Sequence, residues 1–174
     1  MKATERLRAE RALDEIERAK DSQELAWPSA SSRLREARLK TGLDERDLAN
    51  RVPCSVESYS DLEAYDDEMF TVATLKALTA IGEVLAVEPR VLLLGPEAAG
   101  IQNTITFEDV AAKLAQLRRD PHGSAQQLED EIGFRIDDIG TGKALWICTV
   151  EALYQICKSV HVDWVKALPS LSRS

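Results

Sequence analysis

The amino-acid sequence predicts an all-α protein, and three observations carry this prediction. The 174 residues are rich in Ala, Leu, Glu and Arg, which favour helices, whereas only 8 Gly and 6 Pro interrupt the chain. Apolar residues recur at three- and four-residue steps, which is the period of an amphipathic helix. Short stretches of Gly, Pro, Ser and Asp, typical of turns and helix caps, separate the segments that have this period.

Residues 1–30 are predicted to form a helical arm followed by a linker. Apolar residues at helical spacing between residues 3 and 20 are interspersed with charges of both signs. Pro28 disfavours helix at the residue before it, so the linker is expected around this position. Ser31 or Ser32 is the expected N-cap of the next helix, because a serine hydroxyl accepts a hydrogen bond from the free N–H groups of a first turn.

Residues 31–97 contain five further predicted helices. Gly42 and Gly95 are expected to end helices, and Asp44 and Ser55 are expected N-caps. Pro89 suits the first turn of the last of these helices. The expected helices span residues 33–41, 43–52, 56–65, 72–86 and 89–94. Residues 66–71 are expected to be a polar loop between the third and fourth of these helices.

The apolar pattern of this region carries a family resemblance. The positions concerned are Leu34, Ala37, Leu43, Leu48, Ala49, Val52, Val56, Tyr59 and Leu62, followed by the step Val87, Glu88, Pro89. With them, the segment from Ser32 to Leu94 resembles the lambda-repressor-like helix-turn-helix domain of the Cro/C1 type (the XRE family). That resemblance implies five short helices, of which the second and third form the helix-turn-helix motif.

Residues 98–174 look like a degenerate second copy of the same domain. Leu75, Leu78, Ile81, Leu85, Val87 and Leu93 align at a constant offset with Val150, Leu153, Ile156, Val160, Val162 and Leu168. Repeats of this size indicate tandem units, although two helical segments can also share an apolar rhythm by chance. Gly140 and Gly142 fall in the third helix of the second copy, so that helix is expected to be short or irregular.

The resemblance also implies a function and a set of candidate residues. In this family the third helix enters the major groove of DNA, and dimers match palindromic operators. The DNA-binding candidates are therefore Val56, Glu57, Ser60 and Asp61 on the reading helix, Ser55 near phosphate, and the cations Arg33, Arg38 and Arg135. The resemblance thus implies a DNA-binding transcriptional regulator that acts on duplex DNA as a homodimer.

The charge of the chain favours a second reading. The formal net charge is -8, whereas a surface that binds DNA is usually basic. Two of the base-facing candidates are acidic, and the sequence predicts that Glu63, Asp66, Asp67 and Glu68 extend them into a negative ridge. The alternative is an acidic protein-binding module of the antitoxin, immunity or anti-repressor type, which keeps the fold and binds a protein partner instead of DNA. Both readings stay open at this point.

The sequence gives no indication of an enzyme, a cofactor or a metal site. The motifs of serine hydrolases, phosphate-binding loops and zinc proteases are absent. The three cysteines form no CxxC pair, which fits a reduced cytoplasm, and they are expected to pack as small apolar side chains. No apolar run approaches the roughly 20 residues that cross a bilayer. We therefore expect a cytoplasmic protein that has no membrane partner.

Overall fold

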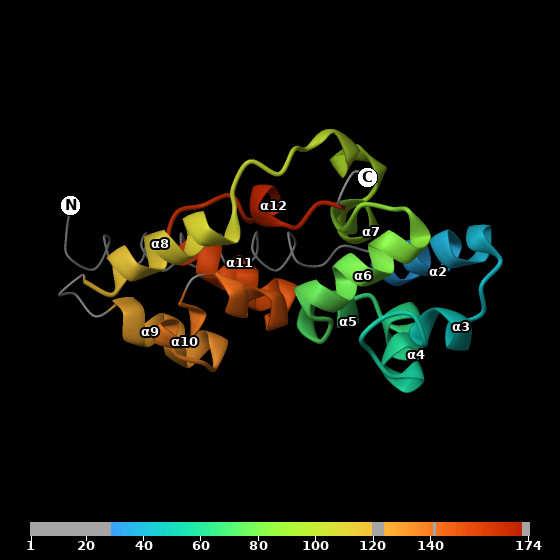
Figure 1. Ribbon diagram of the computed structural model, residues 1–174, viewed down its shortest axis with the longest axis horizontal. Coiled ribbons are helices and arrows are strands. Elements are labelled where there is room, and N and C mark those ends of the chain that lie inside the picture. The colour runs from blue at the N-terminus through green and yellow to red at the C-terminus, as the bar shows by residue number, and fades with distance from the viewer. Residues whose placement is uncertain (1–28, 120–123, 141, 172–174) are drawn as a thin grey trace, which may run out of the picture.

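The computed structural model describes residues 29–119, 124–140 and 142–171, and within them the protein is helical with no β-strand. The all-α prediction is therefore confirmed for this part of the chain. The helices form an elongated body, with α2 to α7 at one end and α8 to α12 mostly at the other (Figure 1). The predicted arm helix over residues 3–20 lies outside the described residues.

Helices of four to twelve residues make up both halves of the body. The first half, residues 29–100, contains α2 (Ala30–Thr41), α3 (Glu45–Ala49), α4 (Val56–Ala64), α5 (Glu68–Thr71), α6 (Leu75–Leu85), α7 (Pro89–Leu94) and the 3-10 helix η1 (Pro96–Gly100). The second half, residues 101–171, contains α8 (Phe107–Leu117), α9 (Ser124–Ile132), α10 (Ile136–Ile139), the 3-10 helix η2 (Lys143–Ile147), α11 (Val150–Ser159) and α12 (Trp164–Ala167). As expected from its glycines, α10 is short, with only four residues.

Side-chain caps explain where several helices begin. Asp44, Ser55 and Thr74 each accept a hydrogen bond from the backbone N–H three residues later, over 2.7, 3.1 and 3.2 Å. Thr106 and Thr149 do the same at the starts of α8 and α11, over 3.1 and 3.2 Å. Each cap satisfies a donor that the first helical turn leaves free. The predicted caps Asp44 and Ser55 are thus confirmed.

The start of α2 differs from the prediction. Ser29 is its N-cap residue, and Ser31 and Ser32 lie within the first turn of the helix, so the expectation that one of them caps it was wrong. Ser31 is buried, and its N–H and hydroxyl donate to Asp66 over 3.1 and 2.7 Å. The serine therefore joins α2 to the segment after α4, a contact 35 residues away in sequence that a local capping rule does not consider.

Residues 66–71 were expected to be a polar loop, and here too the prediction was wrong. They include the one-turn helix α5, in which Met69 and Phe70 are buried. Burial of these two side chains anchors the segment, which packs against both α4 and α11. Two large apolar residues among acidic neighbours were the signal that the prediction underweighted.

The two halves share one hydrophobic core. A single cluster of buried side chains includes Leu34, Leu48 and Tyr59 from the first half and Leu114 and Leu153 from the second. Five of the six aligned pairs of the predicted repeat, such as Leu78 with Leu153 and Ile81 with Ile156, are buried in both halves, and the pair Val87 and Val162 is half-buried. The halves therefore do not fold around separate cores.

The junction between the halves is formed by the starts of α6 and α11. Thr74 and Thr149 form an isolated antiparallel bridge, in which the Leu75 N–H donates to the Cys148 carbonyl over 2.8 Å. On either side of this bridge, α5 packs on α11 and η2 packs on α6. Thr74 and Thr149, which cap the two helices, are 75 positions apart, the same offset that relates the apolar residues of the predicted repeat.

A glycine in α6 makes close packing possible at the end of this helix. A Cβ atom on Gly82 would lie 2.6 Å from the Val87 carbonyl oxygen and 3.3 Å from Pro89 Cδ. The backbone at Val87 comes this close to Gly82 because Ala86 adopts the left-handed conformation, with a φ of 54°. In this turn the Val87 N–H donates to the Gly82 carbonyl over 3.0 Å. Gly82 therefore sets how closely α7 follows α6.

We predict that Gly82→Ala destabilises the protein by about 1–2 kcal/mol, because the clash with backbone outweighs the gain in helix propensity. Gly100→Ala is the matched control, since a Cβ there meets no atom within 4 Å, and its effect should stay within about 0.5 kcal/mol. Urea denaturation followed by circular dichroism measures both. Equal stability of Gly82→Ala and the wild type would contradict the packing described here.

Candidate functional site

Helices α3 and α4 form the candidate surface. They pack against each other, and α4 also packs against α2. Tyr59 and Leu62 on the inner side of α4 are buried, whereas Glu57 and Asp61 on its outer side are exposed. This division follows the helical period, because residues three or four apart share a face. The outer side of α4 is therefore available to a partner.

The structure brings five of the eight candidate residues together on this surface. Ser55 is exposed and caps α4, Val56 is half-buried against the core, and Glu57 and Asp61 are exposed. Ser60 is half-buried, and its hydroxyl donates to Glu45 of α3. Of the three exposed residues among the five, two are carboxylates.

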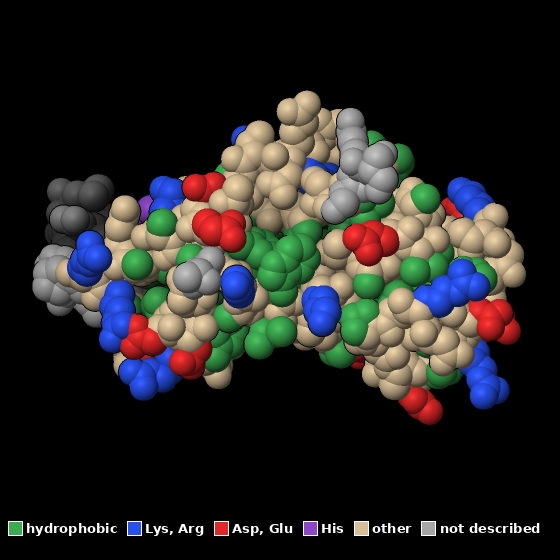
Figure 2. All heavy atoms as spheres, viewed as in Figure 1, with side chains coloured by type: hydrophobic (Ala, Val, Ile, Leu, Met, Phe, Trp, Pro, Cys, Tyr) green, Lys and Arg blue, Asp and Glu red, His purple; other side chains and the backbone are tan. Residues whose placement is uncertain are grey.

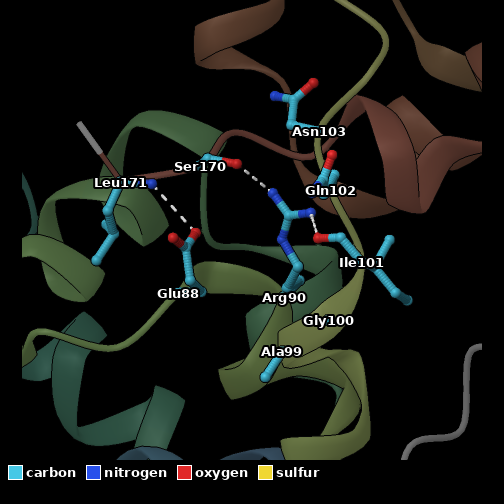
Figure 3. Close-up of a pocket in the computed structure, with 9 residues that line it drawn as sticks. All are labelled: Glu88, Arg90, Ala99, Gly100, Ile101, Gln102, Asn103, Ser170 and Leu171. Carbon is cyan, nitrogen blue, oxygen red and sulfur yellow. Dashed lines mark hydrogen bonds between the residues drawn. The ribbon is translucent and has the colours of Figure 1, made fainter. Parts of the chain in front are cut away.

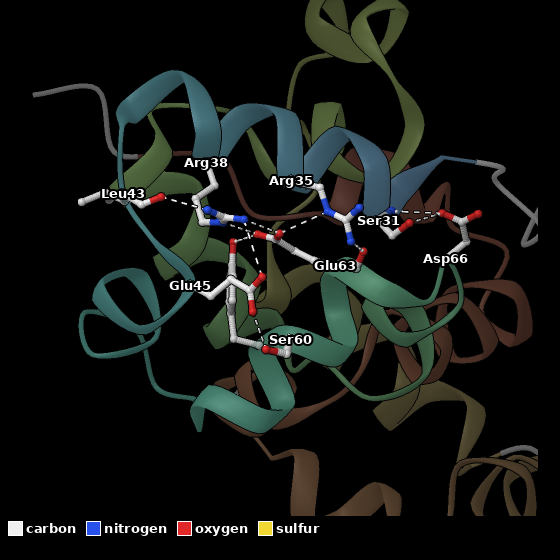
Figure 4. Close-up of polar contacts among 9 residues, drawn as sticks. Ser31, Arg35, Arg38, Leu43, Glu45, Ser60, Glu63 and Asp66 are labelled. Carbon is white, nitrogen blue, oxygen red and sulfur yellow. Dashed lines mark hydrogen bonds and ion pairs between the residues drawn. The ribbon is translucent and has the colours of Figure 1, made fainter.

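Arg38 and Glu63 form a buried ion pair beneath this surface (Figure 4). Arg38 Nε donates to Glu63 Oε1 over 2.6 Å and Nη2 donates to Oε2 over 2.8 Å, a bidentate arrangement. The Tyr59 hydroxyl donates to Glu63 Oε1 over 2.7 Å, and Arg38 Nη1 donates to the Leu43 carbonyl over 2.9 Å. The pair thus joins α2, α4 and the turn before α3.

The charge state of this cluster follows from its contacts. Burial acts to raise the pKa of Glu63, but hydrogen bonds from Arg38 and Tyr59 and the positive charge of Arg38 outweigh it, and the pKa lies below its ordinary value. The hydrogen bond to Glu63 raises the pKa of Arg38, and burial raises the pKa of Tyr59. All three groups therefore hold their ordinary charge at neutral pH.

The two cations predicted in the first half both point into the protein. Arg38 is 7% exposed and bonded to Glu63 and Leu43, as described above. Arg33 is half-buried, and its guanidinium donates to the carbonyls of Leu92 and Leu93 at the end of α7, over 2.8 and 2.5 Å. Both guanidinium groups thus bond to the protein itself, although the sequence suggested that they face phosphate.

The predicted negative ridge is shorter than the sequence suggested. Glu63 is 2% exposed, so its expected place on the surface was wrong. The physical reason is its pairing with Arg38, 25 residues away in sequence. Asp66 remains exposed but is bonded to Ser31. The acidic part of the outer surface of α4 is accordingly reduced to Glu57 and Asp61.

Arg135, the remaining candidate, lies in the second half. It is the N-cap residue of α10, and its side chain is 71% exposed. Its Nη2 lies 3.5 Å from Oδ2 of Asp137, while Arg118 of α8 forms an ion pair with Oδ1 of the same carboxylate. The second half thus also joins its first helix to its third by an ion pair, but there the pair is at the surface.

Besides Arg38, sequence reasoning missed the burial of two charged residues, Glu63 and Arg90. Glu63 lies four residues after Tyr59 and one after Leu62, which places it on the same inward-facing side of the helix. This spacing could have indicated from the sequence that Glu63 is buried. Arg90 is 1% exposed and lies between Pro89 and the apolar run Val91 to Leu94. The only feature of the sequence that could have indicated its burial is its position as a single cation among apolar residues.

Searches against protein-family models, curated proteins and solved structures found no match. Within the described part of the chain, no helix has the length and apolar character needed to cross a membrane. In the same part, no group of three or more His, Cys, Asp or Glu side chains is arranged to hold a metal ion.

We predict that Glu63→Gln lowers the free energy of unfolding by roughly 3 kcal/mol, because it leaves the Arg38 charge buried without a carboxylate. Glu57→Gln is the matched control, since this side chain is exposed, and its effect should stay within about 0.5 kcal/mol. Chemical denaturation of both variants measures the difference. A loss for Glu63→Gln no larger than that for Glu57→Gln would show that the pair contributes little.

Proposed function

We propose that the protein is a helix-turn-helix-fold module that binds a basic protein surface through the outer face of α4. The observation that carries this proposal is the charge of that face, where Glu57 and Asp61 are exposed and α4 contains no Lys or Arg. A DNA duplex presents phosphates, which an acidic helix repels, whereas a basic protein surface complements it. The antitoxin, immunity and anti-repressor classes are functions of this kind.

Neighbouring side chains add to the acidic character of the surface. Asp44 and Asp47, at the start of α3, are exposed. These carboxylates occupy the helix N-terminus, which would otherwise attract an anion such as a phosphate. Arg46 and Arg51 are exposed cations in this segment; Arg46 lies in the first turn of α3 between the two aspartates, and Arg51 follows the helix. The acids thus occupy the positions where a DNA-binding unit needs hydrogen-bond donors or cations.

The arrangement of the halves supports a second part of the proposal, that the protein is a pair of lambda-repressor-like units. In both halves, helices follow in the same order, and a threonine-capped helix, α6 or α11, precedes a short one. The packing at the Thr74–Thr149 bridge is reciprocal, since α5 contacts α11 and its counterpart η2 contacts α6. This reciprocal packing is the pattern that two related units facing each other across the bridge would give.

Charge reversal on α4 tests the proposed partner surface. Tagged full-length protein is expressed in its own host, cross-linked and purified as wild type and as Glu57→Lys/Asp61→Lys. We predict one principal protein partner for the wild type, at least about a tenfold loss of that partner for the double variant, and weaker capture at high salt. Glu83→Lys/Glu151→Lys is the matched control, because both residues are exposed and lie on α6 and α11. Equal capture by all three proteins would contradict the proposal.

DNA binding remains a second candidate because of one observation on the other half. Arg118, Arg119 and Arg135 are exposed around α10, and α10 lies along the same edge of the body as α4 (Figure 1). Figure 2 shows Lys and Arg side chains spread along one face among Asp and Glu side chains, with hydrophobic side chains near the middle. A gel-shift assay at low salt with the gene's upstream DNA distinguishes the candidates. A shift that Arg119→Gln/Arg135→Gln weakens would favour DNA binding over a protein partner.

A further inference from the structure

A cavity of about 490 Å³ lies where α7, the segment between the halves and the C-terminal end of the described chain meet (Figure 3). Its lining includes Glu88, Arg90, Gln102, Asn103 and Ser170. Cavities of this size suit small-molecule ligands. None of the residues that line the cavity belongs to α3 or α4, so the cavity is separate from the proposed partner surface.

Arg90 is the unusual side chain in this cavity. It is 1% exposed, and its terminal nitrogens donate to the carbonyls of Ile101 and Leu168 and to the hydroxyl of Ser170. All three acceptors are neutral. Its Nε–H has no acceptor among the described residues. A guanidinium carries five N–H donors and no acceptor, so these three bonds leave two donors without an acceptor among the described residues, and the buried Nε–H is one of them.

Among the residues that the structure describes, no carboxylate lies within ion-pair distance of Arg90. Glu88 lines the same cavity, yet no ion pair of 4.0 Å or less joins it to Arg90 in the described structure. One Glu88 oxygen, Oε2, accepts from the Leu171 N–H over 3.1 Å. The carboxylate retains lone pairs for further donors. The cavity therefore holds one buried cation and one carboxylate that are not paired with each other.

We propose that this cavity binds a small zwitterion of the α-amino acid class. The ligand carboxylate accepts from Arg90, including its unused Nε–H, and the ligand ammonium donates to Glu88. Such a ligand neutralises a buried charge whose isolation is costly, and it supplies the missing acceptor. The segment at Ile101 and Gln102 and the residue Ser170 lie around the remaining space, so the ligand would contact the connection between the two halves.

The two charges distinguish a zwitterion from a simple anion. An inorganic phosphate gains from Arg90 but is repelled by Glu88, because like charges in a partly buried site oppose each other. A monocarboxylate accepts hydrogen bonds from Arg90 but offers no ammonium group to Glu88. An amino acid satisfies both. The proposal therefore predicts an order of affinity, in which the amino acid binds better than the matched carboxylate, and the carboxylate binds better than phosphate.

Isothermal titration calorimetry on the full-length protein tests this order. The probes are L-leucine and L-glutamine, with 4-methylpentanoate as the carboxylate matched to leucine, 3-methylbutylamine as its amine, and inorganic phosphate. We predict binding of at least one amino acid and at least about tenfold weaker binding of the matched single-charge probes. Arg90→Gln should abolish binding, whereas Arg119→Gln, the matched exposed arginine, should leave it unchanged.

Glu88→Gln keeps the proposal testable if Arg90→Gln does not fold, which circular dichroism reports. This variant should bind the amino acid and the matched carboxylate with similar affinity, because it loses the group that recognises the ammonium. No binding of either amino acid up to about 10 mM would overturn the proposal. Phosphate binding as tight as amino acid binding, or amino acid binding that neither Arg90→Gln nor Glu88→Gln changes, would overturn it as well.

Discussion

The ion pair between Arg38 and Glu63 is the interaction on which the candidate surface depends. It connects α2 with α4 inside the first half, and the Tyr59 hydroxyl completes the contacts of the carboxylate. A paired charge in the interior fixes orientation, because rotation of either helix would leave a charge without its partner. The pair thus holds Tyr59 inward and Glu57 outward. It also withdraws one cation and one anion from the surface, so that the exposed charge of α4 is set by Glu57 and Asp61.

The junction at Thr74 and Thr149 sets how the halves meet. Each threonine caps its own helix with its side chain while their backbones form the bridge. The same two threonines therefore cap the helices and join the two halves. This arrangement joins the two sets of helices over one continuous core, with the connecting segment crossing one side. The cavity at Arg90 lies where that segment meets Ser170 and Leu171.

The sequence predicted the features that local rules govern. The caps at Asp44 and Ser55, the stop at Gly95 and the amphipathic period of α6 each depend on residues a few positions apart, and the structure has them all. The burial of Arg38, Glu63 and Arg90 was not predicted. Whether a charged side chain is buried depends on partners 25 or more residues away, such as Glu63 for Arg38 and Ser170 for Arg90. For the same reason the acidic surface was predicted as longer than it is.

The ionisation of Glu63 tests this account most directly, because the orientation of α4 and the charge of its surface both follow from the buried pair. Carbon-detected NMR of the side-chain carboxyl, followed over a pH titration of the folded protein, gives its pKa. The account predicts a pKa below the ordinary value of 4.5, together with slow hydrogen exchange at Arg38 Nε–H. A Glu63 pKa at or above 4.5, with Arg38 Nε–H exchanging as fast as that of an exposed arginine, would contradict it.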